Sequence, residues 1–459
     1  MSSFLKVLGG AALSAALVVG GASARAETLT DALIDAYKNS HLLEQNRAVL
    51  RAADEDVARA VAALRPIIDF AINGRYQDGN TRSPTQGRYS SSAQAELTAR
   101  LTLYDGGNNR LAIDAARESV LATRAALLGV EQNVLLAAVQ AYMDVFSAVQ
   151  NVTLAENNVR LISQQLRATE DRFEVGEVTR TDVSLAQSRL AASRSNLVSA
   201  QGNLAIAREA YKLAIGRYPG ALSGIPRFPA LPQNSDAARA IAVKTHPEIV
   251  QAQHNVTVAE LNLGRAKAAM RPSISASAGV VAEDDGGKYG SVGLSLNQTI
   301  YQGGGLYAAE RQARAGVEQA RAGLLQAVRL VEERVGNAWS SLAVARAQLT
   351  ATEEQIAAAK LAFEGTREEA RLGARTTLDV LDAEQELLDA RTAWVQAEAN
   401  QYVAIYRVLS AMGLLTAQHL DLGIPTYDPR AYYNAVSNAP AKSIQGKQLD
   451  KVLERLGRN

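Results

Sequence analysis

The chain has 459 residues, a formal net charge of +1, 5% aromatic residues and no cysteine. The near-neutral charge gives no indication of a nucleic acid or other polyanionic partner, and the lack of cysteine excludes disulfides, thiolate metal sites, thiol catalysis and a lipidated N-terminal cysteine. Abundant alanine with few aromatic residues is typical of long helices that meet through small side chains.

Residues 1–26 predict a secretory signal peptide. They contain a lysine, a short apolar run and small residues for cleavage after Ala24 or Ala26. A membrane-anchoring helix is the less favoured alternative, because glycine and serine interrupt the short apolar run. No later stretch of about 18 apolar residues is expected to span a membrane, so any crossing of a membrane would use strands.

Residues 27–216 and 236–413 are two copies of one repeat. Tyr104 to Gly216 matches Tyr301 to Gly413 with a constant offset of 197 positions, and the chain upstream matches with an offset of 206. The change in offset marks a loop within the strand region. A linker with four prolines, residues 217–235, joins the two copies.

Each repeat predicts a helix followed by a pair of strands. Apolar and polar residues alternate over about 66–76 and 89–104 in the first repeat, and over about 272–282 and 289–301 in the second. About ten residues is the length that a tilted strand needs to cross a bilayer. Tyrosines lie at the predicted strand ends, as in the interfacial girdle of a membrane barrel: Tyr76, Tyr89, Tyr104, Tyr289 and Tyr301.

Four strands cannot close a barrel, and an unpaired sheet edge cannot face lipid. Identical copies must therefore pool their strands. Because about eight strands make a barrel filled by side chains, twelve strands from a trimer would surround a water-filled lumen.

Long helices follow the strands in each repeat. Apolar residues recur every seven positions over about 108–172 and 180–215, and again over about 306–371 and 376–412. This period predicts left-handed supercoiling, and about 64 helical residues span about 95 Å. Residues 414–459 are predicted to form a polar, partly disordered C-terminal segment, and its tail beyond about Thr426 is not expected to join the core.

A glycine, a threonine-rich turn and an aspartate recur where the long helices turn. Gly176 and Gly373 are predicted to end helices, and Asp182 and Asp379 to follow in the first turn of the next. Helix capping explains one aspartate in each repeat. It does not explain Asp382, which lies three residues after Asp379 on the same helix face. Around a threefold axis this pair would place six carboxylates at the mouth of a tube.

No pattern indicates an enzyme, a cofactor or a metal site. The four histidines have no metal-ligand spacing to one another. The glycine run 303–305 lacks the spacing and the lysine of a phosphate-binding loop, and its counterpart Gly106-Gly107 is typical of a strand-to-helix turn.

The duplicated repeat, the signal peptide, the strand-end motifs YDGG and YQGG, and the turns VGEVTRTD and LGARTTLDVLD together resemble the TolC family of outer-membrane channel-tunnels. The resemblance implies a mixed α and β fold, in which a trimeric 12-stranded outer-membrane β-barrel with four strands per chain continues into a long periplasmic α-helical coiled-coil barrel. It also implies an outer-membrane location and a trimer that projects into the periplasm.

The resemblance assigns roles to the turn residues. Asp379 and Asp382 fall on the aspartate pair that narrows the pore, and Arg375 falls on an arginine that tethers the inner coil to Thr181 and Asp182. A second tether in the family uses a tyrosine at the position of Ala370. Its absence implies that fewer links, or other links, hold the closed state.

The implied function is passive conduction, in which untwisting of the helix ends opens the duct. The partners implied by the resemblance are a second and third copy of the chain, outer-membrane lipid, a periplasmic adaptor protein, and an inner-membrane ABC exporter or efflux pump. The cargo is a secreted protein or a small toxic compound. The alternative is a secreted periplasmic coiled-coil scaffold without a channel.

Overall fold

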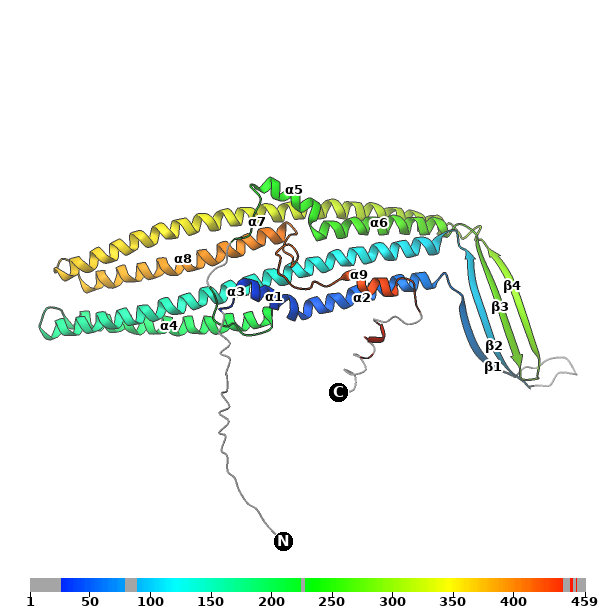
Figure 1. Ribbon diagram of the computed structural model, residues 1–459, viewed down its shortest axis with the longest axis horizontal. Coiled ribbons are helices and arrows are strands. Elements are labelled where there is room, and N and C mark those ends of the chain that lie inside the picture. The colour runs from blue at the N-terminus through cyan, green and yellow to red at the C-terminus, as the bar shows by residue number, and fades with distance from the viewer. Residues whose placement is uncertain (1–25, 79–88, 224–227, 441–445, 449–450, 452–459) are drawn as a thin grey trace, which may run out of the picture.

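The computed structural model describes residues 26–78, 89–223, 228–440, 446–448 and 451. The predicted signal peptide lies outside the described residues, apart from Ala26. The molecule is elongated, with a long helical layer that carries a sheet at one end (Figure 1).

The two repeats have the same order of elements. The first contains α1 (Leu29–Asn39), α2 (His41–Ala62), β1 (Ile67–Asp78), β2 (Tyr89–Tyr104), α3 (Asn108–Glu174) and α4 (Arg180–Ile215). The second contains α5 (Ser235–Thr245), α6 (Pro247–Ala268), β3 (Ser273–Glu283), β4 (Lys288–Asn297), α7 (Gly305–Arg371) and α8 (Thr377–Ala411), and α9 (Pro429–Val436) follows.

The helical segment before each strand pair is divided into two helices. The break lies at Ser40 in the first repeat and at His246 in the second, where an extended residue caps the next helix. The Ser40 side chain accepts a hydrogen bond from the Leu43 N–H, and Pro247 follows His246 at the first position of α6. These residues favour a helix start.

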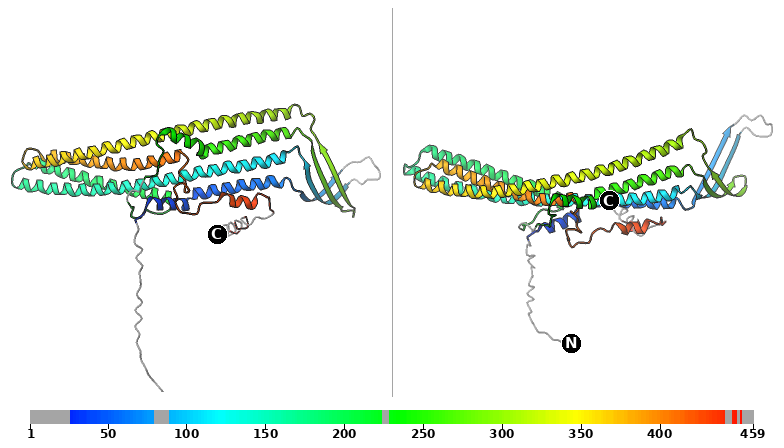
Figure 2. Two further views of the ribbon diagram at one scale, coloured as in Figure 1. Left: turned by 45° about the horizontal axis from the view of Figure 1, so that its top comes forward. Right: turned by 90° about the horizontal axis from the view of Figure 1, so that it is seen from above.

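The long helices lie side by side in one curved layer (Figure 2). α3 and α7 contain 67 residues each, which corresponds to about 100 Å. α4 packs against α3 and α8 packs against α7 in the half away from the sheet. In the other half α2 packs against α3, and α6 lies between α3 and α7.

The main hydrophobic core lies in the middle of the molecule, where the short helices meet the long ones. Predicted seven-residue positions such as Ala138, Val145, Val335 and Leu342 are buried there. Small and β-branched side chains at these positions allow the helices to approach closely.

α3 contains a longer apolar stretch than predicted. It contains a window of 18 residues that is apolar enough to cross a membrane by length and composition, so the expectation that no such stretch follows the signal peptide was wrong. Leu135, Val139 and Met143 of α3 are buried in the main core. Packing against neighbouring helices therefore accounts for part of its apolar character, since 39% of the window is buried.

The four strands form one antiparallel sheet in the order β1-β2-β3-β4. The two predicted hairpins are joined because β2 pairs with β3 across the repeats, with Ala99 opposite Ala278. β4 ends at Asn297, before the predicted end at residue 301. The outer edges of β1 and β4 have no strand partner among the described residues of the chain.

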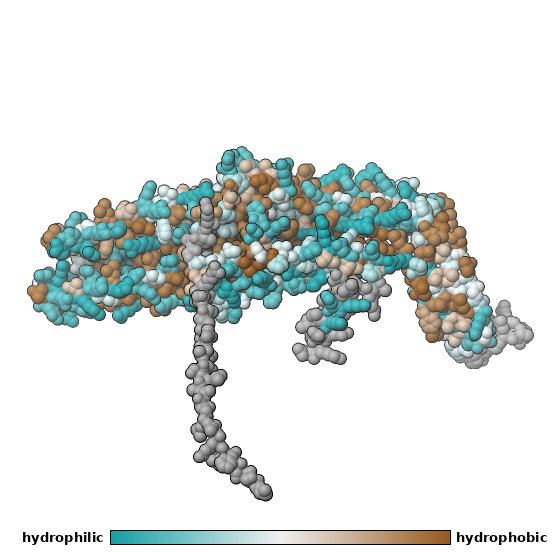
Figure 3. Space-filling view, in the orientation of Figure 1, coloured by the Kyte–Doolittle hydropathy of each residue, from teal (hydrophilic) through white to brown (hydrophobic). Residues whose placement is uncertain are grey.

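The strand register gives the sheet one apolar and one polar face. The apolar face carries Ile68, Phe70, Ile72, Leu97, Leu101, Val280, Val292, Leu294 and Leu296. The polar face carries Asp69, Thr98, Arg100, Ser275, Ser277 and Ser295. Phe70, Ile72 and Val292 are 67%, 71% and 89% exposed in the single subunit, and apolar residues cover much of the sheet in Figure 3.

The chain after Ala26 is anchored by Glu27, which is buried. Its backbone N–H donates to the Ala221 carbonyl at 2.8 Å, and its carboxylate accepts hydrogen bonds from Arg217, Tyr211 and the Gly220 N–H. Tyr142 donates to the carbonyl of Ser223 at 2.9 Å. The start of the first repeat is thus bound to the beginning of the linker.

The C-terminal segment is partly packed, which corrects the prediction that its tail beyond about Thr426 stays out of the core. Leu415, Ala417 and Leu422 are buried in the main core. Tyr432 and Val436 of α9 pack against Ala58 of α2. The apolar residues in this segment are too sparse to form a periodic pattern, so the sequence did not reveal the packing.

Candidate functional site

The two turns between the long helices have the same backbone structure. α3 ends at Glu174 and is followed by Gly176 with φ of +81°, and α7 ends at Arg371 and is followed by Gly373 with φ of +83°. In both turns the glycine N–H donates back to the helix, Gly176 to Phe173 at 3.0 Å and Gly373 to Ala370 at 3.1 Å. Glycine occupies this left-handed conformation without a steric penalty.

Both turns continue into a capping box. The Asp182 carboxylate accepts hydrogen bonds from the backbone N–H and the hydroxyl of Thr179, at 2.8 and 2.7 Å. The Asp379 carboxylate does the same with Thr376, at 2.9 and 2.8 Å. Hydrogen bonds to the ionised form hold the pKa of both carboxyl groups below the usual value. Capping therefore accounts for one carboxylate oxygen of each residue.

Asp382 has a different partner. Arg189 of α4 forms an ion pair with it, with 2.5 Å between Arg189 Nη2 and Asp382 Oδ1. Asp382 and Asp379 lie one turn apart on α8, so they share a helix face. The structure thus places the two aspartates together and gives each a separate contact.

Arg375 pairs within its own turn. Its Nε donates to Glu369 Oε2 at 2.9 Å, and this bond, together with the charges of Glu369 and Asp379, raises the pKa of the guanidinium. Thr181 is exposed. The tether from Arg375 to Thr181 and Asp182 of a neighbouring subunit stays a prediction.

Glu384 is a buried carboxylate that was not among the predicted site residues. It is 5% exposed, its Oε1 has no hydrogen-bond partner among the described residues, and burial raises its pKa to about 7. Its spacing in the sequence could have revealed it, because it lies three residues after Leu381 and four before Leu388, on an apolar face.

Ala370 is partly buried and packs against a cluster that contains Phe363 and Val380.

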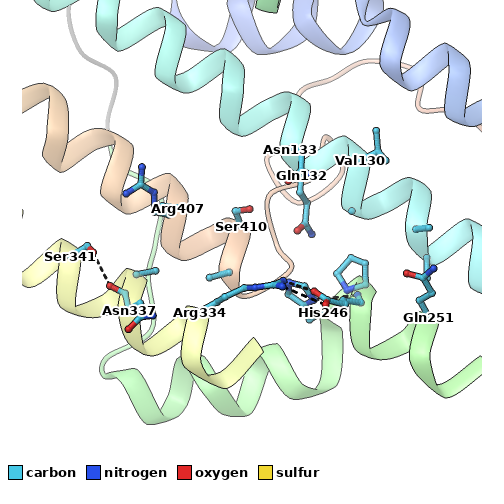
Figure 4. A pocket seen from close by; sticks show the side chains of 17 residues that line it. Val130, Gln132, Asn133, His246, Gln251, Arg334, Asn337, Ser341, Arg407 and Ser410 are labelled. Atoms are coloured by element: carbon cyan, nitrogen blue, oxygen red, sulfur yellow. Dashed lines mark hydrogen bonds and ion pairs between the residues drawn. The ribbon is translucent and has the colours of Figure 1, made fainter. Parts of the chain in front are cut away.

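A hollow of about 780 Å³ lies where α8 and α6 meet end to end, between α3 and α7 (Figure 4). Thr245 ends α5 immediately before the residue that caps α6, and its Oγ1 donates to the Met412 carbonyl at the end of α8 at 2.9 Å. Polar side chains of four helices point into the hollow, including those of Gln132, Arg334 and Arg407. None of the predicted site residues lines it, and four helices from both repeats build it, so no local pattern predicted it.

The tyrosines occupy different positions on the sheet. Tyr76 lies on the apolar face, because it shares its alternation with Phe70 and Ile72. Tyr104 lies opposite Ile274 on the same face, because the register shifts at Leu103. Both are exposed in the single subunit, at 70% and 45%.

Tyr289 differs from the predicted girdle. Tyr289 pairs with Val281, which pairs with Glu96, so it lies on the polar face. The alternation of strand residues thus turns Tyr289 away from the apolar side. Tyr301 follows the end of β4 and is 84% exposed. Tyr89 begins β2 opposite Asp78, so its backbone lies at the strand end where it was predicted.

Comparison with known proteins identifies relatives over most of the chain. The family described as outer membrane efflux protein matches residues 32–217 and 240–414. The chain is 36% identical over 440 residues to the outer membrane efflux protein BepC of Brucella suis biovar 1, which covers 94% of this chain and 95% of that protein. It is 26% identical over 419 residues to the alkaline protease secretion protein AprF of Pseudomonas aeruginosa, with 85% and 86% covered.

The fold is similar to a solved structure. The outer membrane channel CmeC of Campylobacter jejuni superposes with a TM-score of 0.74 at 18% sequence identity, and the match covers 90% of this chain and 89% of CmeC. The arrangement of a four-stranded sheet and long helical hairpins is therefore a channel fold.

Proposed function

This chain belongs to the outer membrane efflux protein family, the TolC-type channels of the outer membrane, and from this premise we propose that three copies form the exit duct of a tripartite export system. A periplasmic adaptor protein and an energised inner-membrane transporter would deliver cargo to the duct. The cargo would then pass to the outside without further energy input.

The single observation that carries the proposal is a sheet of bilayer length with an apolar face and two open edges. β3 and β4 contain 11 and 10 residues, about the length of a tilted crossing strand. Unpaired backbone groups at the edges would each cost several kcal/mol in lipid. Pairing β4 of one copy with β1 of the next removes both edges, and twelve strands leave room for water inside.

The helical layer supplies the second half of the duct. α3 and α7 each extend for about 100 Å, far more than a globular core needs. Joined edge to edge in a trimer, the curved layers would form a tube that is continuous with the barrel. Cargo would remain inside this tube while it crosses the periplasm.

The helix turns would form the closed end of the tube. Asp379 and Asp382 of three copies would place six carboxylates around the axis, and Arg375 would tether each α8 to Thr181 and Asp182 of a neighbouring copy. Rotation of the helix ends away from the axis would widen the opening. Tyr76 and Tyr104, on the apolar face, would anchor the barrel at the lipid–water boundary.

The constriction can be tested in planar lipid bilayers with the purified trimer. The wild-type channel is expected to show a small, cation-preferring conductance that hexamminecobalt(III) blocks. Asp379→Asn combined with Asp382→Asn should abolish the block. Asp171→Asn is the control, because Asp171 is an exposed aspartate near the same end of α3 that has no part in the proposed constriction or tether. A double variant that is blocked like the wild type would refute the constriction.

The proposed tether can be tested by comparing the bilayer conductance of two arginine variants. Arg375→Ser should enlarge the conductance, because one link of the closed state is lost. Arg371→Ser is the control, since Arg371 pairs with Glu368 of its own helix at 2.7 Å. Equal conductance in both variants would rule out a tether at Arg375.

The class of cargo requires a genetic test. One relative is named as an efflux protein and another as a protease secretion protein. Deletion of the gene should remove specific proteins from the culture medium if the cargo is protein, and should lower resistance to toxic compounds if the duct serves efflux. A deletion strain unchanged in both respects would contradict an export role.

A further inference from the structure

The contact between Arg189 and Asp382 joins the two repeats near the proposed constriction. Arg189 lies on α4 and Asp382 on α8, and their charged groups approach to 2.5 Å. The neighbouring residues Leu190 and Leu381 pack together with Ile162 of α3. This apolar cluster fixes the distance between the helices, so the ion pair has a defined geometry although both side chains remain partly exposed.

The ion pair has no counterpart at the repeat-related position. With the offset of 197 positions, Arg189 corresponds to Glu386 and Asp382 corresponds to Leu185. In a ring of alternating α4 and α8 helices, the contact between α8 of one copy and α4 of the next would therefore present a glutamate and a leucine. These two side chains cannot form an ion pair.

Of Arg189, Arg371 and Arg375, Arg189 is the one that forms an ion pair with an aspartate of the predicted pair. Arg375 donates to Glu369 and Arg371 donates to Glu368. Asp379 is hydrogen-bonded to the neutral Thr376, and Arg375 acts on it through its charge, without a hydrogen bond or ion pair between these two described residues. Asp382 alone faces a guanidinium at hydrogen-bonding distance.

We propose that Arg189 is the residue that sets the charge, and hence the ion selectivity, of the constriction, by pairing with Asp382 of its own subunit. The inference rests on the proposed constriction of Asp379 and Asp382. In a trimer, three arginines would offset half of the six carboxylates. The same pair would tie α8 to α4 within each subunit and leave the α8–α4 contacts between subunits free to separate.

The test uses the full-length trimer in planar bilayers, with reversal potentials and block by hexamminecobalt(III) as measurements. Arg189→Gln should raise the cation preference and lower the half-blocking concentration by about tenfold, because three positive charges near the axis are lost. Arg189→Lys should resemble the wild type. Arg194→Gln removes an equal charge from the same helix, at a residue with no ion pair among the described residues, and should change neither quantity.

Exchanging the charges of Arg189 and Asp382 distinguishes an effect of Arg189 on ion selectivity from a purely structural role. Arg189→Glu should increase the cation preference, Asp382→Arg should reduce it, and the two together should restore it toward the wild type. If Arg189→Gln matches Arg194→Gln while Asp379→Asn with Asp382→Asn still abolishes block, the role of Arg189 is overturned and the constriction stands. If that aspartate double variant has no effect, the constriction itself fails.

Discussion

Arg217 holds the carboxylate of Glu27 with two hydrogen bonds, from Nη1 to Oε2 at 3.0 Å and from Nη2 to Oε1 at 2.8 Å. Glu27 is 6% exposed, whereas Arg217 keeps 43% of its side chain in solvent. The outer side of the guanidinium also contacts Asp35, at 2.8 Å from Nε. One arginine thus connects the beginning of the first repeat, α1 and the start of the linker.

Arg217→Met should destabilise the subunit, because it leaves a buried carboxylate without its cation. We expect a loss between the ~1 kcal/mol of an exposed pair and the ~3–5 kcal/mol of a broken buried pair. The measurement is the temperature at which the trimer dissociates in detergent. Asp35→Asn removes only the outer contact and should cost less than about 1 kcal/mol. An equal loss in both variants would contradict the importance of the Glu27 contact.

The two faces of β4 should differ sharply in their tolerance of charge. Leu294 lies on the apolar face opposite Ala276, and Ser295 lies on the polar face opposite Ser275. Leu294→Lys should cost about 2–4 kcal/mol within the bilayer, and Ser295→Lys should have little effect in a water-filled lumen. Folding into lipid vesicles along a urea gradient measures the difference. Comparable losses at the two neighbouring positions would mean that the faces are assigned incorrectly.

Gly373→Ala should loosen the second helix turn. A side chain at φ of +83° costs roughly 1–2 kcal/mol. Gly365→Ala is the control, because Gly365 lies within α7 with open space around it, and alanine there favours the helix by about 1 kcal/mol. Trypsin cleavage after Arg371 and Arg375 should accelerate only in Gly373→Ala. Faster cleavage in both, or in neither, would count against strain at this turn.

Glu384 should make the start of α8 sensitive to pH. Its pKa in the folded protein is about 7, compared with 4.5 when exposed. Between these values the folded state holds a proton that the unfolded state has released, so stability declines as pH rises from about 4.5 to 7 and is constant above. The difference in pKa corresponds to up to about 3 kcal/mol.

Glu384→Gln should remove this dependence and protect α8 at pH 8. Hydrogen–deuterium exchange of peptides from residues 377–390, corrected for the intrinsic effect of pH on exchange, compares pH 6 with pH 8. Glu386→Gln serves as the control, because Glu386 is exposed on the same helix. A wild-type protein equally protected at both pH values would contradict the raised pKa.

The local elements could be predicted from the sequence to within a few residues. Alternation with a period of two placed β1 and β2, and the seven-residue period placed α3 and α7. The capping residues Thr179 and Thr376 act within four residues of their partners, so their contacts are readable from spacing. Turn chemistry, strand alternation and helix periodicity are all short-range properties.

Other features could not be predicted, since their partners are far apart in the chain. Arg189 and Asp382 are separated by 193 positions, and no spacing rule selects one carboxylate over its neighbours at that range. The packing of Tyr432 against α2 and the turn of Tyr289 to the polar face likewise depend on the register of other segments.

The sequence by itself determined a duplicated arrangement of bilayer-length strands and long helices, because side-chain periodicity along one segment decides which of its faces is apolar. Only the tertiary structure decided which segments meet. These contacts are the pairing of β2 with β3, the ion pair between Arg217 and Glu27, and the ion pair between α4 and α8. Such contacts form once chain folding has brought distant residues within hydrogen-bonding distance, and their energies depend on that distance rather than on position in the chain.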